Sequence, residues 1–508
     1  MGLCALLVGA LTEAPGAAAG APLASPRPVT AVSRGATPLT WSACPYPGSP
    51  ASLQCATVKV PLDYAHPQGR QTTVTIDRLK ASGGAHRVGS LVFNPGGPGG
   101  SGTAIVYFES LGANLFSRGV RRHFDIIGLD PRGVGLSNPV RCSPAILNQR
   151  VSLFPRSAAA FHRLKAHNRA LARSCLRRTG PLVKHVDTLS AARDIEAIRR
   201  ALGDGKLNYL GLSYGTLLGE TYADLYPHRI RTMALDAALV HSLPVRTMLA
   251  DEAGGYERSL DRFFRWCRGS SACALHGRNV RRLYRQLVRR ANRSPIPAPS
   301  CHQPGCRPYV TGEDIRFDTQ GLLLFKKPIP LVAPQGWNEL AIAIRQARRG
   351  DASKLSAPLA SSPTDDALNG SAIANECLDW RTPVRHRSDL RRLRRVAQHV
   401  APILRGASQS WTIIAGCVGW PWPPVNPPHR TRVRGTPPVL VVNATHDPST
   451  SYAWARRLSH EITSSVLLTR AGDGHTSYLA HGRSRTRDAI DHYLVTGKTP
   501  PAHTVFHN

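Results

Sequence analysis

Short apolar runs recur along the chain and alternate with longer segments of helical periodicity. The runs predicted as buried strands are 89–93, 124–130, 206–210, 230–235, 438–443 and 465–469. The segments predicted as helices between and after them are 188–202, 216–226, 452–462 and 483–495. Because fully apolar strands that alternate with helices are typical of parallel sheets covered on both faces, this pattern predicts a doubly wound sheet. Two earlier runs, 56–60 and 72–76, alternate polar and apolar residues and predict an opening antiparallel pair.

The alternation of strands and helices stops between residues 250 and 428. Arg-rich helical segments such as 279–293 and 389–400 alternate there with loops rich in Cys and Pro. One helical block that interrupts a strand–helix rhythm predicts an α/β fold with a mostly parallel sheet and an inserted helical cap. The predicted divisions are a signal-like leader and linker at 1–38, a first core part at 39–249, the cap at 250–428 and a last core part at 429–508.

The pentapeptide Gly211-Leu212-Ser213-Tyr214-Gly215 lies between a predicted strand and a predicted helix. A strand, a Gly-x-Ser-x-Gly turn and a helix form the context of a nucleophile elbow, in which a strained turn lifts the serine hydroxyl above the sheet. The amide of Tyr214, at the start of the helix, would lie beside developing negative charge. We therefore predict that Ser213 is a nucleophile rather than a serine in an ordinary turn.

A glycine-rich loop follows the predicted strand 89–93, with the sequence NPGGPGGSG at 94–102. So much glycine after a strand indicates that the backbone approaches another group closely. A phosphate-binding loop would end in Gly-Lys-Ser/Thr, and the prolines here remove amides that such a loop uses. The loop is better interpreted as half of an oxyanion hole, with Gly97 as the amide donor beside Tyr214.

A serine nucleophile needs a base to remove its proton and an acid to orient that base. In a sheet of this kind the acid and the base follow the serine in that order, from loops after late strands. Asp447 follows the strand 438–443, and His475 lies between glycines after the last strand. Asp236, at the end of the strand 230–235, is the alternative acid, whereas Asp473 and His446 are interpreted as loop residues.

Charge and composition change this picture little. The chain has 508 residues, is 42% hydrophobic and carries a formal net charge of +33. The basic residues are scattered and no nucleic-acid motif is present, so the charge favours attraction to an anionic cell envelope over specific nucleic-acid binding. No cofactor is expected, and no metal, because no Cys-x-x-Cys pair with nearby histidines occurs.

The cysteines and the first residues indicate export. Ten cysteines follow Cys4, and an even number in close sequential pairs is typical of disulfides in an oxidising compartment. The expected pairs are Cys44–Cys55, Cys142–Cys175, Cys267–Cys273, Cys301–Cys306 and Cys377–Cys417, although spacing leaves other pairings open. An apolar stretch at 3–11 resembles the centre of a signal peptide but lacks preceding basic residues, and no later run could span a bilayer. We expect a secreted or envelope-associated monomer with no transmembrane segment.

Several motifs together resemble the actinobacterial tripeptidyl aminopeptidase-like group, secreted α/β-hydrolases related to proline iminopeptidases. They are NPGGPGGSG at 94–102, DPRGVGLS at 130–137, GLSYGT at 211–216, CLDW at 377–380, CVGWP at 417–421 and the loops of Asp447 and His475. The resemblance implies a serine peptidase that releases short peptides from free N-termini, with Ser213, Asp447, His475, Gly97 and Tyr214 in the roles above. Ala237 and Thr476 occupy positions where such proteins commonly have glycine.

An aminopeptidase also has to bind the substrate ammonium, and a carboxylate of the cap is the natural group for this. Glu376 and Asp379, on either side of Cys377, are the candidates in the sequence. Two other functions remain open: an esterase or lipase that uses the same triad, and a non-catalytic envelope-binding protein with the same fold. A panel of peptide arylamides and acyl esters distinguishes the peptidase from an esterase or lipase. Active-site labelling distinguishes an enzyme from a non-catalytic protein.

Overall fold

A computed structural model describes residues 39–301, 305–329, 332–360, 367–480 and 482–507. The predicted leader and linker at 1–38 lies outside the described residues. Ten strands form one sheet in the order β1-β2-β3-β5-β4-β6-β7-β10-β11-β12. The strands are β1 (Ser42–Ala43), β2 (Leu53–Pro61), β3 (Gln71–Leu79), β4 (Gly89–Asn94), β5 (Phe124–Leu129), β6 (Leu207–Leu212), β7 (Ile230–Asp236), β10 (Val439–His446), β11 (Ser465–Asp473) and β12 (Val505–His507).

The sheet begins antiparallel and continues parallel. β1 pairs with β2, β2 with β3 and β3 with β5 in antiparallel fashion, whereas all pairs from β5 and β4 to β12 are parallel. The predicted α/β fold with a doubly wound, mostly parallel sheet is thus confirmed. Because parallel neighbours direct their carboxyl ends to one edge, the loops after β4, β6, β10 and β11 gather at the same edge of the sheet.

Helices cover both faces of the sheet, and alternate residues of each strand face different helices. Leu91 and Phe93 of β4 share a core with α1 and α15, whereas Val92 between them shares another core with α5 and α6. This period of two explains why the strand sequences are apolar throughout. The helices of this part are α1 (Gly102–Ser110), α2 (Arg118–His123), α3 (Pro144–Leu147), α4 (Ala158–Thr179), α5 (Thr188–Ala201), α6 (Tyr214–Leu225), α14 (Tyr452–Glu461) and α15 (Arg485–Thr496).

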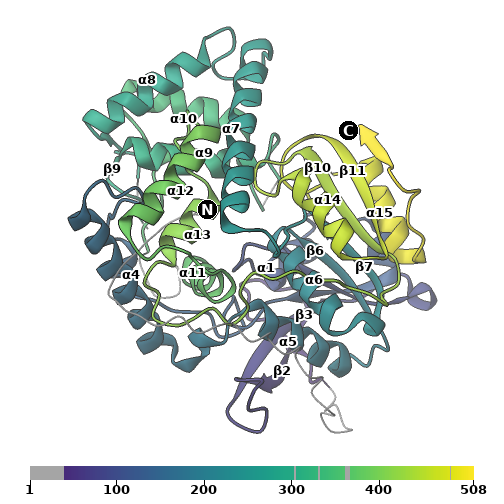
Figure 1. Ribbon diagram of the computed structural model, residues 1–508. Helices are drawn as coiled ribbons and strands as arrows, with labels where there is room; N and C mark the ends of the chain where they lie inside the picture. The colour runs from purple at the N-terminus through teal and green to yellow at the C-terminus, as the bar shows by residue number, and fades with distance from the viewer. Residues whose placement is uncertain (1–38, 302–304, 330–331, 361–366, 481, 508) are drawn as a thin grey trace.

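Between β7 and β10 the described chain is mainly helical, and Figure 1 shows these helices gathered in one body beside the sheet. They are α7 (Val245–Gly269), α8 (Val280–Arg293), α9 (Gly312–Leu324), α10 (Trp337–Arg349), α11 (Ala367–Asp379), α12 (Arg387–Val400) and α13 (Gln409–Gly416), with a short ribbon of β8 (Ile296–Pro297) and β9 (Tyr309–Val310). We refer to this helical body as the cap.

The core of the cap also contains residues from the first part of the chain. Leu153, together with Phe161 and Leu164 of α4, is buried in the same apolar cluster as the cap helices. The segment around α4 therefore packs with the cap even though it precedes the helix of the nucleophile elbow in sequence. The cap as a packed body extends beyond the predicted stretch 250–428.

Five disulfides join Cys44–Cys55, Cys142–Cys175, Cys267–Cys273, Cys301–Cys306 and Cys377–Cys417. The last of these ties α11 to the residue that follows α13, inside the cap. Within the described ranges, no helix is at once long and apolar enough to cross a bilayer.

Candidate active site

Ser213 occupies a strained turn between β6 and α6. Its φ of 55° and ψ of −123° lie outside the regions that a serine ordinarily adopts. Its amide donates to the carbonyl of Asp236 at 3.0 Å, which joins the turn to the end of β7. Such strain persists only where the surrounding structure enforces it, and it is typical of catalytic positions.

The glycines around Ser213 are required by close packing. A Cβ on Gly211 would collide with the carbonyl of Gly215, and a Cβ on Gly215 would lie 2.7 Å from the carbonyl of Asn94. A Cβ on Gly96 would lie 2.8 Å from the Cβ of Ser213 and 2.9 Å from the amide nitrogen of Tyr214. The glycine-rich loop after β4 therefore rests directly on the elbow.

A buried carboxylate holds the end of the glycine-rich loop. Asp130, which follows β5, accepts hydrogen bonds from the Ser101 hydroxyl at 2.7 Å and from the amide of Thr103 at 3.1 Å. Arg132 pairs instead with Asp194 of α5 at 2.6 Å, with both side chains fully buried. Asp130, Arg132 and Asp194 fix the backbone around the site and do not line the catalytic cavity described below.

His475 and Asp447 form a buried pair. Nδ1 of His475 lies 2.9 and 3.0 Å from the two carboxylate oxygens of Asp447. The amides of Ser449 and Thr450 each donate to one of these oxygens at 2.9 Å, and the Thr450 hydroxyl donates to the other at 2.9 Å. The carboxylate is thus held on all sides, and it orients the imidazole.

The other aspartates at this edge have different partners. Asp236 accepts from the amides of Ser477 and Tyr478 at 2.6 and 2.8 Å, so it fixes the backbone after His475. Asp473 is paired with Arg262 and with Lys326. Of the three carboxylates, Asp447 is the one that hydrogen-bonds the imidazole in the described structure.

Two opposing effects act on the pKa of His475. Burial, the largest single effect, disfavours the charged imidazole, but the neighbouring carboxylates, Asp447 foremost, together outweigh it and raise the pKa above its ordinary value. Asp236 and Glu252 add smaller contributions in the same direction. Glu252, on α7, accepts a hydrogen bond from the amide of Ser410, and burial raises its pKa to about 7.

Ser213 and His475 both line one cavity of about 560 Å³ between the sheet and the cap. The glycine-rich loop forms one wall, and α9 with the residues after it forms another. The lining is largely apolar, from Ile105, Phe108, Leu322, Leu324, Phe325, Ile329, Val332, Ala333 and Leu479. This catalytic cavity has room for a short peptide or a medium-length acyl chain.

The predicted oxyanion donors belong to two segments of the chain, the start of α6 and the glycine-rich loop. Tyr214 is the first residue of α6, and its hydroxyl is anchored by Thr188 at 2.6 Å and Asn375 at 2.9 Å. Gly97 lines the cavity with a φ of 115°, and its carbonyl accepts from the Gln409 side chain at 3.3 Å. Gln409, from the start of α13, therefore links the loop to the cap.

The structure places the two predicted ammonium-binding residues behind the cavity rather than on its wall. Glu376 is buried and hydrogen-bonded to the Gln409 side chain, and burial raises its pKa to about 8. Asp379 accepts from the amide of Thr188 at 3.0 Å. Glu376 thus reaches the cavity only through Gln409, and Asp379 supports the start of α5.

Asp318 of α9, which the sequence analysis did not single out, does line the cavity. Its Oδ2 is shielded from solvent and has no hydrogen-bond partner among the described residues. A signal was present in the sequence, because Asp318 follows Ile315 by three residues and precedes Leu322 by four, which places it on the apolar face of the helix.

α9 also contacts the catalytic histidine through its backbone. The amide of His475 donates to the carbonyl of Leu324, the last residue of α9, at 2.7 Å. The ring of Phe325 lies 6.5 Å from the imidazole, centre to centre. The cap therefore helps to hold His475, the predicted catalytic base, in place.

Ala237 and Thr476 both adopt left-handed backbone conformations, with φ of 63° and 58°. Each follows a residue of the site, Asp236 or His475. A residue with a Cβ is strained at such angles, so both turns keep the conformation that glycine would adopt at lower cost.

Two family models match the chain: "alpha/beta hydrolase fold" over residues 89–309 and "TAP-like protein" over residues 401–505. Together with the ten-stranded sheet and the serine elbow at the carboxyl end of β6, these matches define an enzyme of the α/β-hydrolase class. Three curated relatives extend the likeness over nearly the whole chain.

Serine protease Hip1 of Mycobacterium tuberculosis is 30% identical over 490 residues, which cover 92% of this chain and 90% of the relative. Tripeptidyl aminopeptidase of Streptomyces lividans is 30% identical over 89% of this chain and 83% of its own length. Carboxylesterase B of M. tuberculosis is 31% identical over 96% of this chain and 92% of its own length. The chain belongs to the tripeptidyl aminopeptidase-like α/β-hydrolases, and it is a serine hydrolase.

Proposed function

We propose that this protein is an exported aminopeptidase that cleaves short peptides from free N-termini through an acyl-enzyme on Ser213. The observation that carries the proposal is the shared cavity of Ser213 and His475, with the imidazole held by Asp447 on its far nitrogen. This arrangement leaves Nε2 of His475 as the ring nitrogen available to the serine hydroxyl. The tripeptidyl aminopeptidase and serine protease relatives support peptide bonds as the substrate.

In the first step Nε2 of His475 takes the proton of the Ser213 hydroxyl while Oγ bonds to the substrate carbonyl carbon. The carbonyl electrons move to its oxygen, which accepts hydrogen bonds from the amides of Tyr214 and Gly97. Asp447 stabilises the imidazolium without taking its proton. When the intermediate collapses, the C–N bond breaks and the imidazolium protonates the leaving amine.

Water then completes the reaction by the same route. His475 removes a proton from the water molecule, the hydroxide attacks the ester carbon, and the ester bond to Ser213 breaks as Oγ regains a proton from the imidazolium. No metal or cofactor enters any step. The N-terminal peptide and the shortened chain are the products.

Recognition of a free N-terminus requires an anionic group at a fixed distance from Ser213, and we assign this role to Asp318. It is the carboxylate that lines the catalytic cavity, and its Oδ2 lacks a partner among the described residues. Burial, followed by the nearby Asp314, raises the pKa of Asp318, so the empty site favours the neutral acid. A substrate ammonium would stabilise the carboxylate again, and the charge pair would form only with a ligand present.

The disulfides support export as part of the same proposal. Five disulfides persist in oxidising compartments and are rare in reducing cytosol. The net charge of +33 would favour retention at an anionic cell surface.

An esterase is the second candidate, and two observations favour it. A carboxylesterase is among the relatives, and the cavity wall is largely apolar, as an acyl chain requires. Peptidase and esterase would use the same serine, so the choice between them depends on the substrate and not on the triad.

The experiment compares tripeptide arylamides with free and acetylated N-termini against acyl esters of matched leaving groups. The proposal expects the free peptides to be preferred, with acetylation lowering kcat/KM by at least tenfold. Ser213→Ala should abolish both turnover and labelling by a fluorophosphonate. If Ser213→Ala loses labelling but the wild type cleaves only acyl esters, the enzyme is an esterase. If the wild type itself is not labelled, the catalytic proposal fails.

A further inference from the structure

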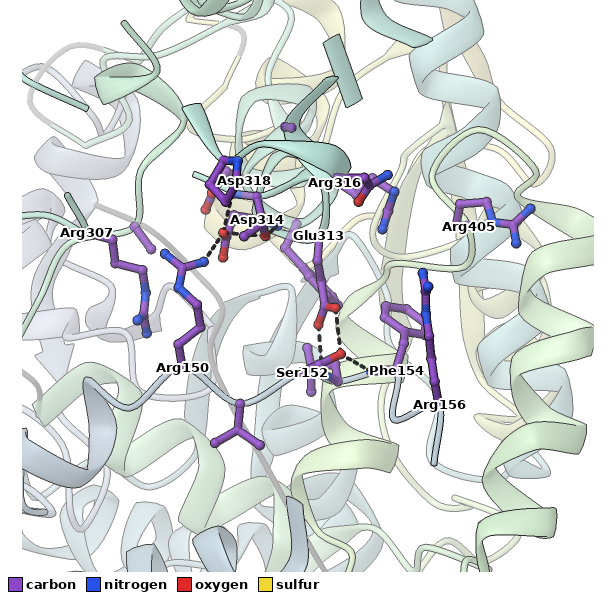
Figure 2. A pocket seen from close by; sticks show the side chains of 18 of the residues that line it. Arg150, Ser152, Phe154, Arg156, Arg307, Glu313, Asp314, Arg316, Asp318 and Arg405 are labelled. Carbon is purple, nitrogen blue, oxygen red and sulfur yellow. Dashed lines mark hydrogen bonds and ion pairs between the residues drawn. The ribbon is translucent and has the colours of Figure 1, made fainter. Parts of the chain in front are cut away.

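The cap contains a second cavity, of about 610 Å³, that is dominated by arginine. Six arginines and three acidic residues line it: Arg150, Arg156, Arg307, Arg316, Arg394 and Arg405, with Glu313, Asp314 and Asp318. Figure 2 shows the guanidinium groups of Arg156, Arg316 and Arg405 on one side of Glu313, and those of Arg150 and Arg307 on the other. We call this space the arginine cavity.

The guanidinium groups of Arg150 and Arg307 have acceptors in the protein. Arg150 is paired with Asp314 and donates to the carbonyl of Tyr309 at 2.7 Å. Arg307 donates to the carbonyl of Asn148 at 3.0 Å. The carboxylate of Glu313 in the middle accepts from the Ser152 hydroxyl and the Leu153 amide, both at 2.7 Å.

The other four arginines of the cavity do not have such acceptors within the described ranges. Among the described residues, no carboxylate lies within ion-pair distance of Arg156, Arg316, Arg394 or Arg405. The Nε atoms of Arg316 and Arg394 are buried and have no hydrogen-bond partner in the described part of the chain. Buried donors without acceptors are rare in proteins, since each costs free energy.

These guanidinium groups also repel one another. The pKa of Arg394 is lowered first by burial and then by the positive charges of Arg156 and Arg405. Burial likewise lowers the pKa of Arg316; Tyr284 and Glu313 oppose this effect, and the same two arginines add to it. Arg156 and Arg405 are exposed, whereas Arg316 is buried, so the cluster extends from the surface into the cap.

We propose that the arginine cavity binds an oxyanion with at least two negative charges, either a phosphate or a polycarboxylate. Guanidinium groups bind such oxyanions through pairs of parallel hydrogen bonds, and several together match a multivalent anion. Phe154, which stacks on Trp411 at 4.8 Å and on Phe317 at 6.0 Å, adds an apolar residue to the lining of the cavity. The anion would supply acceptors for the free Nε atoms and neutralise the repulsion.

The site is distinct from the catalytic cavity but shares a wall with it. Asp318 and Ala357 line both cavities. α9 presents Glu313 and Arg316 to the arginine cavity, and Leu322 and Leu324 to the catalytic one. The anion would therefore bind against the helix whose last carbonyl holds the amide of His475.

The test measures binding of inorganic phosphate and of citrate to the full-length protein by calorimetry and by thermal unfolding, with sodium chloride at equal ionic strength as reference. The wild type should bind at least one of the two anions, and its melting temperature should rise above that in chloride. Arg316→Gln and Arg394→Gln should each weaken binding by about tenfold or more, because each removes a charged donor. Tighter binding of phosphate would identify the ligand as a phosphate, and tighter binding of citrate would identify it as a polycarboxylate.

A matched control removes one exposed arginine of the cap that does not line the cavity, as in Arg289→Gln. This variant should bind like the wild type. Without multivalent anions, Arg394→Gln should unfold at the same temperature as the wild type or higher, since it relieves repulsion, and phosphate or citrate should reverse that order. Equal effects of chloride and both anions, or unchanged affinity in Arg316→Gln and Arg394→Gln, would overturn the proposal.

Discussion

The catalytic cavity and the arginine cavity share a wall, yet they differ in whether their charged side chains have partners within the protein. In the catalytic cavity the charged acid is fully partnered, because Asp447 accepts from two amides, a hydroxyl and the imidazole. In the arginine cavity five of the six guanidinium groups, all but that of Arg150, lack a carboxylate within ion-pair distance among the described residues. Both cavities lie against α9.

The difference separates two uses of a buried charge. A charge that takes part in every turnover is fixed in advance by the protein, since reorganisation during the reaction would slow it. A charge that waits for a ligand is left without a partner, and the protein tolerates the resulting loss of stability. Asp318 differs from both, because burial favours its neutral form and the carboxylate would form when a substrate ammonium binds. The following changes test this division.

The largest effect is expected from Asp447→Asn. The amide preserves the shape of the side chain, but it no longer stabilises the imidazolium and favours the wrong tautomer of His475. We expect kcat to fall by about 10⁴, as for the equivalent change in a serine protease triad. Steady-state kinetics on the preferred substrate measure this fall. Arg316→Gln is the control from the arginine cavity, where kcat should stay within about twofold of the wild type; comparable losses would remove the distinction.

Asp318→Asn should have the next largest effect, on binding of the free N-terminus. Loss of the carboxylate removes a charge-assisted contact with the ammonium, so KM for a free peptide should rise by about 10- to 100-fold. Cleavage of an acyl ester, which has no ammonium, should change less than twofold. An equal loss on both substrates would show that Asp318 supports the fold of the cavity rather than the substrate.

The pH profile tests how the partners of His475 set its charge. The reaction requires the neutral imidazole, so kcat/KM should fall about tenfold per pH unit below the pKa of His475. Because that pKa is raised, half of the activity should be lost at a pH above the 6.5 of an ordinary histidine. Glu252→Gln removes a negative charge that favours the imidazolium and should move the midpoint to lower pH. A midpoint at or below 6.5 in the wild type, or an upward shift in Glu252→Gln, would contradict this account.

The smallest effect is expected from Ala237→Gly, which tests the strain beside Asp236. Glycine tolerates the φ of 63°, and relief of strain should exceed the added entropy of the unfolded chain. The free energy of unfolding should rise by about 0.5–1 kcal/mol. Ala238→Gly is the matched control: the neighbouring residue is also buried but has no positive φ, so its free energy of unfolding should fall by a similar amount. Denaturant unfolding compares the two.

Much of the sheet could be predicted because its strands are apolar runs with clear ends. The expected strand 230–235 is β7 (Ile230–Asp236), and the expected helix 279–293 is α8 (Val280–Arg293). The edge strands β1 and β12 were not predicted, because they are only two and three residues long and have little apolar pattern. Their pairing depends on the neighbouring strand rather than on their own sequence.

The candidate site shows a similar limit. Asp236, Asp447 and Asp473 all lie at carboxyl ends of parallel strands, so the order of the triad in the chain favoured Asp447 but left Asp236 as an alternative. The contact of Asp447 with His475 is visible only in the folded structure. In the cap the difficulty is greater, because no strand fixes the direction of a side chain. Glu376 and Asp379 were chosen for their place beside a cysteine, but which helix face borders a cavity depends on tertiary packing.

The hydrogen bond between the His475 amide and the Leu324 carbonyl constrains how substrate can enter. Because the main chain of α9 accepts this hydrogen bond, the cap cannot move away from the sheet as one rigid body without breaking its contact with the His475 loop. Any opening that preserves the alignment of the imidazole has to flex elsewhere along the rim, while the carboxyl end of α9 stays docked. Substrate would therefore enter past a part of the cap other than the carboxyl end of α9, which keeps His475 in position.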